Sequence, residues 1–394
     1  MYDLLIKNAR LYPLLTDTSP VPARTLAVND GRIAALGVPE DTPAREVFDA
    51  RDRLLLPGLM DCHTHALYAG DRMAEHVQKM QGASYADIAR AGGGIQTTVA
   101  AVRAASEQQL LDETLPRLAA LRAEGVTCVE IKSGYGLDAA TELKMLRAIR
   151  SLRRHIDMDI SATFLGAHAV PKERFREDYF NEVIEKMLPV VAEEKLADSV
   201  DIFVEHIAFT PDDMQHLFER AAKLGLHLRV HSDQLSNLGA TALAAECGAL
   251  SCDHLEYSNE TDVAAMAMHG TVAVLLPAAF YFLRESRKPP VGLLREHGVP
   301  MAVASDLNPG SAPVASLLTA MHMAGILFGL TPAEILLGVT KHAARVLGRA
   351  DRAGALAPGY HADFALWDLP APEFLCYQLG GLKPETVFFK GKPS

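Results

Sequence analysis

Strand-like apolar runs alternate with helix-like segments through the middle of this 394-residue chain. The candidate strands are residues 54–60, 126–131, 160–165, 200–204, 226–230, 249–252, 271–276 and 301–304. The helix-like segments between them include residues 106–124, 141–154, 212–224 and 240–247. Eight such alternations over about 300 residues predict an α/β fold of the (β/α)8 TIM-like barrel type. A doubly wound sheet is the alternative, because strands are hard to count from sequence alone.

Short strand-like runs also occupy both ends of the chain. They are residues 4–6, 25–28, 32–36, 362–367 and 386–389. Asp30-Gly31 lies between two of these runs and is typical of a hairpin turn. Neither end is large enough to form a core alone. We therefore expect residues 1–55 and 356–394 to build one small β-sandwich domain and residues 56–355 to form the barrel.

The composition excludes several classes of protein. The chain has 49 acidic against 38 basic residues and a formal net charge of −11, and such a surface repels a nucleic-acid backbone. No apolar run reaches the length of about eighteen residues that a membrane span needs, and the N-terminal residues lack a signal-peptide layout. The five cysteines are scattered without a Cys-x-x-Cys pair, which predicts reduced thiols and a cytoplasmic protein.

Two histidines follow the first candidate barrel strand. His63 and His65 are two residues apart, so on an extended backbone both imidazoles point to the same side and can bind one ion. Imidazole suits zinc or iron. An isolated histidine pair is more often part of the surface or the core. Barrel enzymes, however, place their chemistry at the C-terminal ends of the strands, and this position favours a metal site.

Other candidate strands also end in polar side chains. The fifth runs into His231, the sixth into Asp253-His254 and the eighth into Ser305-Asp306. The C-terminal ends of barrel strands meet at one mouth, so these groups should converge. A metal site is predicted there, with His254 just outside the ligand set, which is His63, His65, His231 and Asp306.

A second metal ion is not expected. The strand near residue 200 ends in Glu205-His206 and offers no lysine there. A carbamylated lysine that bridges two ions therefore has no obvious source at this position. The sequence predicts one metal ion per subunit.

This constellation resembles the amidohydrolase superfamily, in which a metal-dependent barrel is paired with a small β-sandwich built from both termini. Nearly the whole chain is similar to one family within it, the imidazolonepropionases. The motifs that carry the similarity are 56–65 (LPGLMDCHTH), 91–95 (AGGGI), 130–138 (EIKSGYGLD), 163–169 (TFLGAHA), 231–235 (HSDQL), 253–257 (DHLEY), 274–283 (VLLPAAFYFL) and 305–310 (SDLNPG). The His-x-His pair marks only the superfamily, whereas SGYGLD and GAHA are far more specific.

The resemblance implies hydrolysis of the cyclic amide C–N bond of 4-imidazolone-5-propanoate to N-formimidoyl-L-glutamate, the third step of histidine degradation. It implies zinc or iron on His63, His65, His231 and Asp306. It places substrate contacts on Arg72, Tyr135, His168 and Gln234, and product-side contacts on Asn308, Gly310 and Ser311. By analogy, a homodimer is expected.

Two positions vary within that family. Some relatives carry glutamate where this chain has Gln234, and a glutamine cannot shuttle a proton near neutral pH. A general-base role at this position is therefore doubtful in this chain. Others carry threonine where this chain has Ser311, and both residues supply a hydroxyl group.

The chemistry of ring opening assigns further roles. Asp306 can take a proton from water and return it to the leaving nitrogen, and His254 can orient the water or stabilise an oxyanion. The Arg72 guanidinium matches the propanoate carboxylate and offsets the acidic surface. Tyr135 lies between two glycines in a loop expected to be flexible, and His168 is expected to donate a hydrogen bond to the substrate.

Two other functions are consistent with parts of the pattern. A cytosine or guanine deaminase of the same superfamily would share the metal chemistry, but it would need neither Arg72 nor the Tyr135 loop. A non-enzymatic protein that keeps the barrel would be expected to lose ligands, whereas this chain retains all the candidates. The anionic imidazolone is therefore the favoured substrate.

Overall fold

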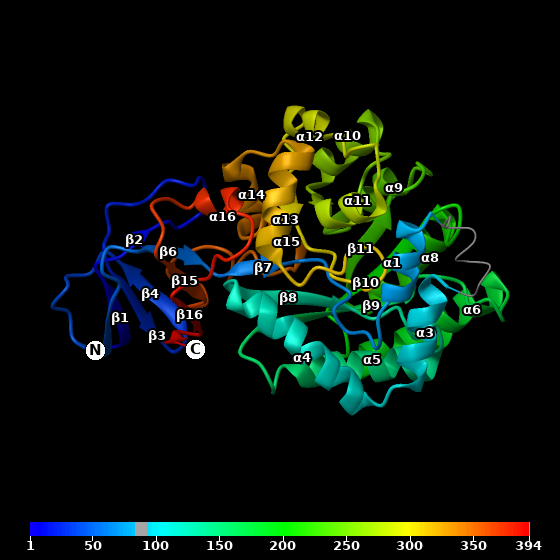
Figure 1. Ribbon diagram of the computed structural model, residues 1–394, viewed down its shortest axis with the longest axis horizontal. Helices are drawn as coiled ribbons and strands as arrows, with labels where there is room; N and C mark the ends of the chain where they lie inside the picture. Colours follow the sequence, from blue (N-terminus) through cyan, green and yellow to red (C-terminus); the bar gives the residue numbers. More distant parts are fainter. Residues whose placement is uncertain (83–92, 394) are drawn as a thin grey trace.

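The computed structural model describes residues 1–82 and 93–393, so Ala91 and Gly92 of the AGGGI motif lie outside the described residues. Figure 1 shows a larger barrel region and a smaller β region at one side, where both chain ends lie. Among the described residues, no helix is both long and apolar enough to cross a bilayer.

The larger region contains an eight-stranded sheet in which neighbouring strands pair in parallel and in sequence order. Its strands are β7 (Leu59–Asp61), β8 (Val126–Lys132), β9 (Asp159–Ala167), β10 (Ser199–Val204), β11 (His227–Ser232), β12 (Ser251–His254), β13 (Val272–Leu275) and β14 (Met301–Val303). Every one of the eight predicted strands overlaps one of these. The predicted (β/α)8 barrel is confirmed.

The first and last barrel strands are joined just beyond their ends. The carboxylate of Asp61 accepts hydrogen bonds from the backbone N–H (3.1 Å) and the hydroxyl of Ser305. Two backbone hydrogen bonds continue the contact, from Asp306 to His63 (3.1 Å) and from His65 to Leu307 (2.9 Å). These bonds bring the His63–His65 segment against the Asp306 segment.

Helices follow most strands, and several of them begin at a side chain that caps the helix. Ser106 caps α4 (Glu107–Ala123), Asp138 caps α5 (Ala139–Leu152) and Thr210 caps α8 (Pro211–Lys223). The other helices of the barrel region are α1 (Met73–Met80), α3 (Ile95–Ala104), α6 (Arg176–Glu182), α7 (Leu188–Glu193), α9 (Ala240–Glu246), α10 (Glu260–His269), α11 (Pro277–Leu283), α12 (Val291–Glu296), α13 (Leu317–Met323), α14 (Pro332–Gly338) and α15 (Lys341–Val346). Two π-helical turns extend helices, at Val183–Met187 and Ala324–Phe328.

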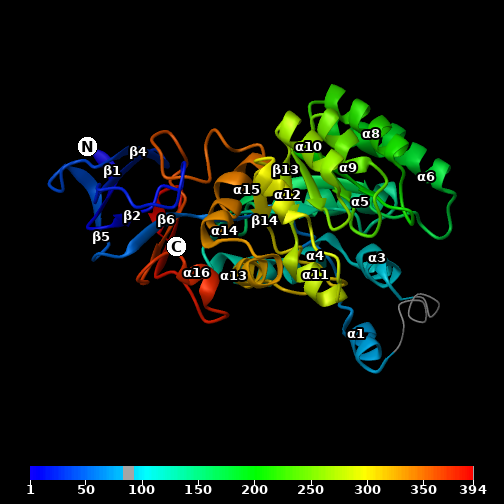
Figure 2. The same ribbon diagram turned by 90° about the horizontal axis from the view of Figure 1, so that it is seen from above.

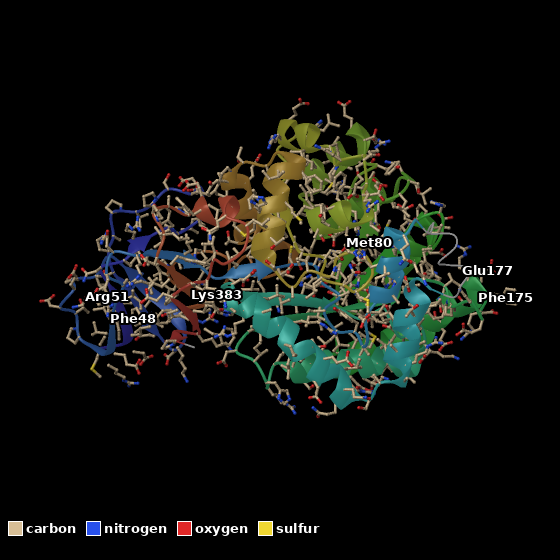
Figure 3. All side chains as sticks on the ribbon, in the orientation of Figure 1. Phe48, Arg51, Met80, Phe175, Glu177 and Lys383 are labelled. Atoms are coloured by element: carbon tan, nitrogen blue, oxygen red, sulfur yellow. The ribbon has the colours of Figure 1, made fainter. Side chains whose placement is uncertain are left out.

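The smaller region consists of two sheets, with the short helix α16 (Phe374–Tyr377) in the C-terminal segment. One sheet has the order β4-β3-β1-β5 and the other β17-β16-β15-β6-β2. The strands are β1 (Tyr2–Lys7), β2 (Arg10–Leu11), β3 (Leu26–Asn29), β4 (Arg32–Leu36), β5 (Ala44–Asp49), β6 (Leu54–Pro57), β15 (Phe364–Trp367), β16 (Thr386–Phe389) and β17 (Lys392–Pro393). Leu4, Leu55 and Phe364 belong to the one apolar core shared by the two sheets. The Phe48 ring, labelled in Figure 3, meets Phe388 edge-on at 5.3 Å.

The run predicted as one strand at 54–60 forms two strands. β6 pairs with β15 in the small region, whereas β7 pairs with β8 in the barrel. Gly58 separates them at a point of close approach, because a Cβ atom on residue 58 would lie 2.1 Å from Thr127 Oγ1. The chain therefore passes from one region to the other at Gly58.

Candidate metal centre

Three histidines from the ends of two barrel strands meet at the barrel mouth. His63 and His65 follow β7, and His231 lies in β11. One ring nitrogen of each histidine lies within 4.8 Å of a ring nitrogen of each of the other two. All three side chains are buried. His231 Nε2 is 3.4 Å from His65 Nε2.

The Asp306 carboxylate joins this cluster. Its Oδ1 atom is 3.4 Å from His63 Nε2 and 3.5 Å from His65 Nε2. The ring of His254 lies farther out, with its centroid 5.5 Å from that of His231 and 5.9 Å from that of His63. The structure therefore brings the four expected ligands together with His254 beside them.

The donor atoms have the state that a metal ligand requires. His63 Nδ1–H donates to Asp253 Oδ2 (2.6 Å) and His231 Nδ1–H donates to Asp201 Oδ1 (3.1 Å). His63 Nε2 has no hydrogen-bond partner among the described residues, so its lone pair is available to an ion. Burial holds the pKa of His63 and His65 well below the usual range, so both are neutral. These features fit a zinc or iron ion.

At the barrel mouth, burial strongly shifts the pKa of two further titratable groups, Asp306 and His168. Burial raises the pKa of Asp306 to about 7, and the nearby His231 opposes that rise. Burial, together with His231, lowers the pKa of His168 to about 4. His168 is therefore neutral near pH 7. A positive charge added close to Asp306 would favour the ionised form of the Asp306 carboxyl group.

Sequence reasoning missed a cluster of charged side chains beneath the histidines. All of its members are fully buried, and they project from four barrel strands. They are Glu130, Lys132, Asp201, Arg229 and Asp253. The detectable signal was the presence of charged residues inside otherwise apolar strands, because an ionised group is rarely buried unless it is paired.

Lys132 is a buried lysine near the histidines that had not been considered as the source of a carbamate bridging two metal ions. Its Nζ atom lies 2.7 Å from Glu130 Oε1 and 2.8 Å from Asp201 Oδ2. Burial and Arg229 act to lower its pKa, but Asp201 and Glu130 outweigh them and raise it. An ammonium ion held between two carboxylates is not a nucleophile for carbamylation, so Lys132 does not provide a bridging carbamate.

One cavity of about 240 Å³ opens over the histidine cluster. Every substrate-contact residue expected from the sequence lines it. These residues are Arg72, Tyr135, His168, Gln234, Asn308, Gly310 and Ser311. The metal-ligand candidates His65, His231 and Asp306 and the neighbouring His254 line it too, whereas His63 does not. Lys79 also lines the cavity and was not anticipated.

Arg72 is held at the start of α1 by a buried glutamate. Its Nε atom donates to Glu75 Oε2 (2.9 Å), and Nη2 donates to the same oxygen. The other oxygen of Glu75 accepts from Gly94 N (3.1 Å) and Thr97 Oγ1 (2.9 Å), which fastens α1 to α3, its neighbour in Figures 1 and 2. The Arg72 side chain is therefore fixed before any substrate binds.

The Tyr135 loop differs from the flexible loop that the sequence predicted. The buried carboxylate of Glu142 accepts backbone hydrogen bonds from Gly134 (2.9 Å), Gly136 (2.7 Å) and Leu137 (3.0 Å). The Tyr135 ring lies 5.8 Å from the His65 ring, and burial keeps the pKa of its phenol far above its usual value. Tyr135 is thus a fixed hydrogen-bond donor.

His168 also differs from its predicted role. Its Nδ1–H donates to the carbonyl oxygen of Gly134 (2.9 Å). Because the ring is neutral, its Nε2 atom carries a lone pair. His168 can therefore accept a hydrogen bond from a ligand in the cavity through Nε2, rather than donate one as expected.

The two remaining loops of the cavity are held in the same manner. Glu205 accepts from the backbone N–H groups of Leu235 (2.7 Å) and Ser236 (3.2 Å), next to Gln234. Asn308 Oδ1 accepts from Gly310 (2.8 Å) and Ser311 (2.7 Å). Much of the Asn308 amide is therefore engaged in shaping its own loop.

Several residues at the strand ends adopt left-handed backbone conformations. They include Asp233 (φ 54°), His254 (φ 85°), Leu255 (φ 75°) and Asp306 (φ 52°). Such conformations cost energy for residues other than glycine, and they persist where the surrounding structure imposes them. Two of these residues, the candidate ligand Asp306 and the neighbouring His254, line the cavity.

Comparison with known proteins identifies the family. Residues 54–393 match the amidohydrolase family model. The chain is 50% identical to an imidazolonepropionase of Hahella chejuensis, covering 98% of both chains. It is 52% identical to an imidazolonepropionase of Erwinia tasmaniensis, covering 93% of this chain and 92% of the relative.

The chain belongs to the imidazolonepropionases of the amidohydrolase family. Two solved structures that resemble this chain at low sequence identity bear on the fold. An adenosine deaminase from Xanthomonas campestris with bound zinc has a TM-score of 0.74 at 19% identity, covering 100% of this chain and 92% of that chain. A 5-methylcytosine deaminase from Klebsiella pneumoniae has a TM-score of 0.75 at 19% identity, covering 99% and 96%.

Proposed function

We propose that this chain hydrolyses the cyclic amide C–N bond of 4-imidazolone-5-propanoate and releases N-formimidoyl-L-glutamate. The observation that carries the proposal is that a fixed Arg72 and the buried histidine cluster lie at the same cavity. The relatives from Hahella chejuensis and Erwinia tasmaniensis, which are named imidazolonepropionase, support the same activity. The substrate is thus a small anion.

We assign one metal ion, zinc or iron, to the Nε2 atoms of His63, His65 and His231 and to the carboxylate of Asp306. Such an ion supplies Lewis acidity and lowers the pKa of the water that it binds from about 16 to about 7. The neutral rings of His63 and His65 and the Nδ1 contacts of His63 and His231 support this assignment. The choice between zinc and iron depends on measurement, because both suit this donor set.

The propanoate tail is assigned to the Arg72 end of the cavity. Glu75 engages the Nε side of the guanidinium, which leaves Nη1 beside Gly310 for a substrate carboxylate. A charge-assisted hydrogen bond of this kind is stronger than a neutral one and selects an anionic tail. Lys79, at the same cavity, adds positive charge.

The ring of the substrate is assigned to the space between Tyr135 and His168. The phenol of Tyr135 donates a hydrogen bond, whereas His168 Nε2 accepts one from a ring N–H. Gln234 can do either through its amide, but it cannot transfer a proton near neutral pH. The Glu205-braced loop keeps Gln234 at the cavity wall.

The proton transfers are assigned to Asp306. Its carboxylate accepts one proton of the attacking water and then donates it to the leaving nitrogen, so that the lactam C–N bond breaks; the carboxylic acid that forms releases the second proton to solvent and becomes a carboxylate. His254 orients the water or stabilises the oxyanion from the side of the cavity. The position of Asp306 beside His63 and His65 supports this assignment.

A direct comparison of substrates tests the proposed function. Purified protein loaded with zinc or iron is assayed with 4-imidazolone-5-propanoate and, separately, with cytosine and guanine. The proposal predicts rapid turnover of the propanoate-bearing ring and none of the neutral bases. Turnover of a base alone would assign the site to a deaminase. The proposal also includes a cytoplasmic location and a homodimer. Sedimentation of the purified protein tests the homodimer.

A further inference from the structure

The five charged side chains beneath the histidines form one connected network. Lys132 Nζ contacts Glu130 and Asp201, and it lies 4.0 Å from Asp253 Oδ2. Arg229 Nη1 lies 2.8 Å from Glu130 Oε1, and its Nη2 atom lies 3.1 Å from Asp253 Oδ2. Two cations thus hold three carboxylates, and every member is fully buried.

This network reaches two of the candidate ligands through their imidazole rings. Asp201 uses Oδ2 for Lys132 and Oδ1 for His231 Nδ1, so each oxygen has a separate partner. Asp253 uses Oδ2 for both Arg229 and His63 Nδ1. A ring that donates Nδ1–H to a fixed carboxylate is held in one tautomer and one orientation, with Nε2 on the side away from that carboxylate.

The network also holds the backbone on both sides of His63. Arg229 Nη2 donates to the carbonyl oxygen of Cys62 (2.7 Å), and Glu130 Oε2 accepts from the N–H of Thr64 (3.1 Å). Lys132 contributes through its own backbone N–H, which donates to the carbonyl oxygen of Thr64 (2.9 Å). The segment that carries His63 and His65 is therefore tied to the same charges that orient the rings.

We infer that Lys132 is a positioning residue for the metal centre, acting through the Asp201 carboxylate that orients His231 and near the Asp253 carboxylate that orients His63. The inference rests on the proposed function, because it takes these histidines as metal ligands. Without the ammonium group, Asp201 loses the partner of Oδ2 and is held only through Oδ1, which contacts His231 Nδ1 and the backbone N–H of Ile202 (2.7 Å). Asp253 keeps Arg229 (3.1 Å), so the effect should be largest at His231.

A second reading is that Lys132 serves stability alone, since removal of one partner of a buried ion pair is destabilising wherever it lies. The chain offers a matched control for this reading. Arg349 is only 6% exposed and pairs with Asp159 (Nε–Oδ2, 2.6 Å) at the start of β9, the opposite end of the barrel from the histidines. Arg349→Met removes a comparable buried cation without touching the network.

The test measures zinc binding to the whole chain, without substrate. Wild type, Lys132→Met and Arg349→Met are stripped of metal, and zinc alone is titrated against a chromophoric chelator. We expect Lys132→Met to bind zinc about 10- to 100-fold more weakly than wild type, as is typical when a group behind a metal ligand is lost. Arg349→Met should bind as wild type does, although both variants should melt at lower temperature.

Equal zinc affinity in wild type and Lys132→Met would overturn the inference, and so would an equal loss in the two methionine variants. If Lys132→Met does not fold, Lys132→Gln, which keeps a donor but no charge, is judged by the same criteria. Asp201→Asn adds a double-mutant cycle: removal of Lys132 should cost less in that background than in wild type, because the two act together. If wild type itself binds no zinc, the proposed metal centre fails rather than this inference alone.

Discussion

The guanidinium of Arg72 occupies the space that a side chain on residue 310 would need. A Cβ atom on Gly310 would lie 2.6 Å from Arg72 Nη1. The backbone of Gly310 is not in the left-handed region, so close approach rather than backbone conformation is what demands glycine there. This contact links two loops of the cavity, those that begin after β7 and β14.

Gly310→Ala should therefore displace Arg72 and weaken substrate binding. We expect KM for 4-imidazolone-5-propanoate to rise about tenfold or more, equivalent to the loss of about 1.4 kcal/mol from a charge-assisted hydrogen bond, with zinc content unchanged. Steady-state kinetics with metal analysis checks this. Arg72→Ala sets the upper limit of the effect, and an unchanged KM in that variant would refute the carboxylate role of Arg72.

His231→Ala should lose metal and activity together. The imidazole supplies one of the proposed ligand atoms and is the only one of them that β11 provides. Elemental analysis of the purified variant should find well under one ion per chain, and turnover should fall by several orders of magnitude. A variant that kept a full complement of metal would remove His231 from the ligand set.

Glu142→Ala should release the loop that carries Tyr135. Three backbone N–H groups would lose a buried acceptor, and each unsatisfied group costs about 1–3 kcal/mol unless water replaces the glutamate. We expect a lower melting temperature and a higher KM with metal retained. Glu142→Gln keeps one amide oxygen as an acceptor and should be intermediate. Wild-type kinetics in Glu142→Ala would show that the loop does not need this carboxylate.

Glu256 gives a prediction about pH. Burial raises its pKa to about 8, and its Oε2 atom has no hydrogen-bond partner among the described residues. In the unfolded chain this group ionises near its ordinary pKa of about 4.5, whereas in the folded chain it stays protonated until about pH 8. The contribution of Glu256 to stability therefore falls as the pH rises through that window, and above it the full penalty remains.

Glu256→Gln removes this dependence because the amide is neutral at every pH. The variant should be no more stable than wild type at pH 5 and more stable at pH 9, by an amount of the order of a few kcal/mol. Urea unfolding at pH 5, 7 and 9 measures the difference. A difference that stays constant over this range would mean that the carboxyl group does not titrate in the folded protein as described.

Much of the fold could be predicted because buried parallel strands consist of short runs of apolar residues. Val272–Leu275 and Met301–Val303 are two examples, and both were located within a residue or two. β5 (Ala44–Asp49) was missed because it is largely exposed and its sequence, AREVFD, lacks such a run. Pro57-Gly58 marks a break in the apolar run at 54–60, but the division of that run between two sheets was not predicted, because it depends on pairing partners far away in the sequence and on the approach of Thr127 to Gly58.

Some residues of the candidate site could likewise be predicted from the sequence and others could not. His63, His231 and Asp306 could be proposed from sequence, because each lies at the end of a strand whose place in the barrel is predictable. The glutamates that brace the cavity loops could not, since Glu75, Glu142 and Glu205 act on backbone groups that only the folded structure brings to them. For the same reason, the acceptor role of His168 Nε2 follows from a contact to Gly134.

The central claim is that one metal ion in this cavity is required to open the imidazolone ring. The most direct test follows the absorbance of freshly prepared 4-imidazolone-5-propanoate with purified protein before chelation, after chelation and after the return of zinc or iron. The account predicts rapid turnover that disappears on chelation and returns with one ion per chain. Full turnover by metal-free protein, or none by fully metallated protein, would contradict it.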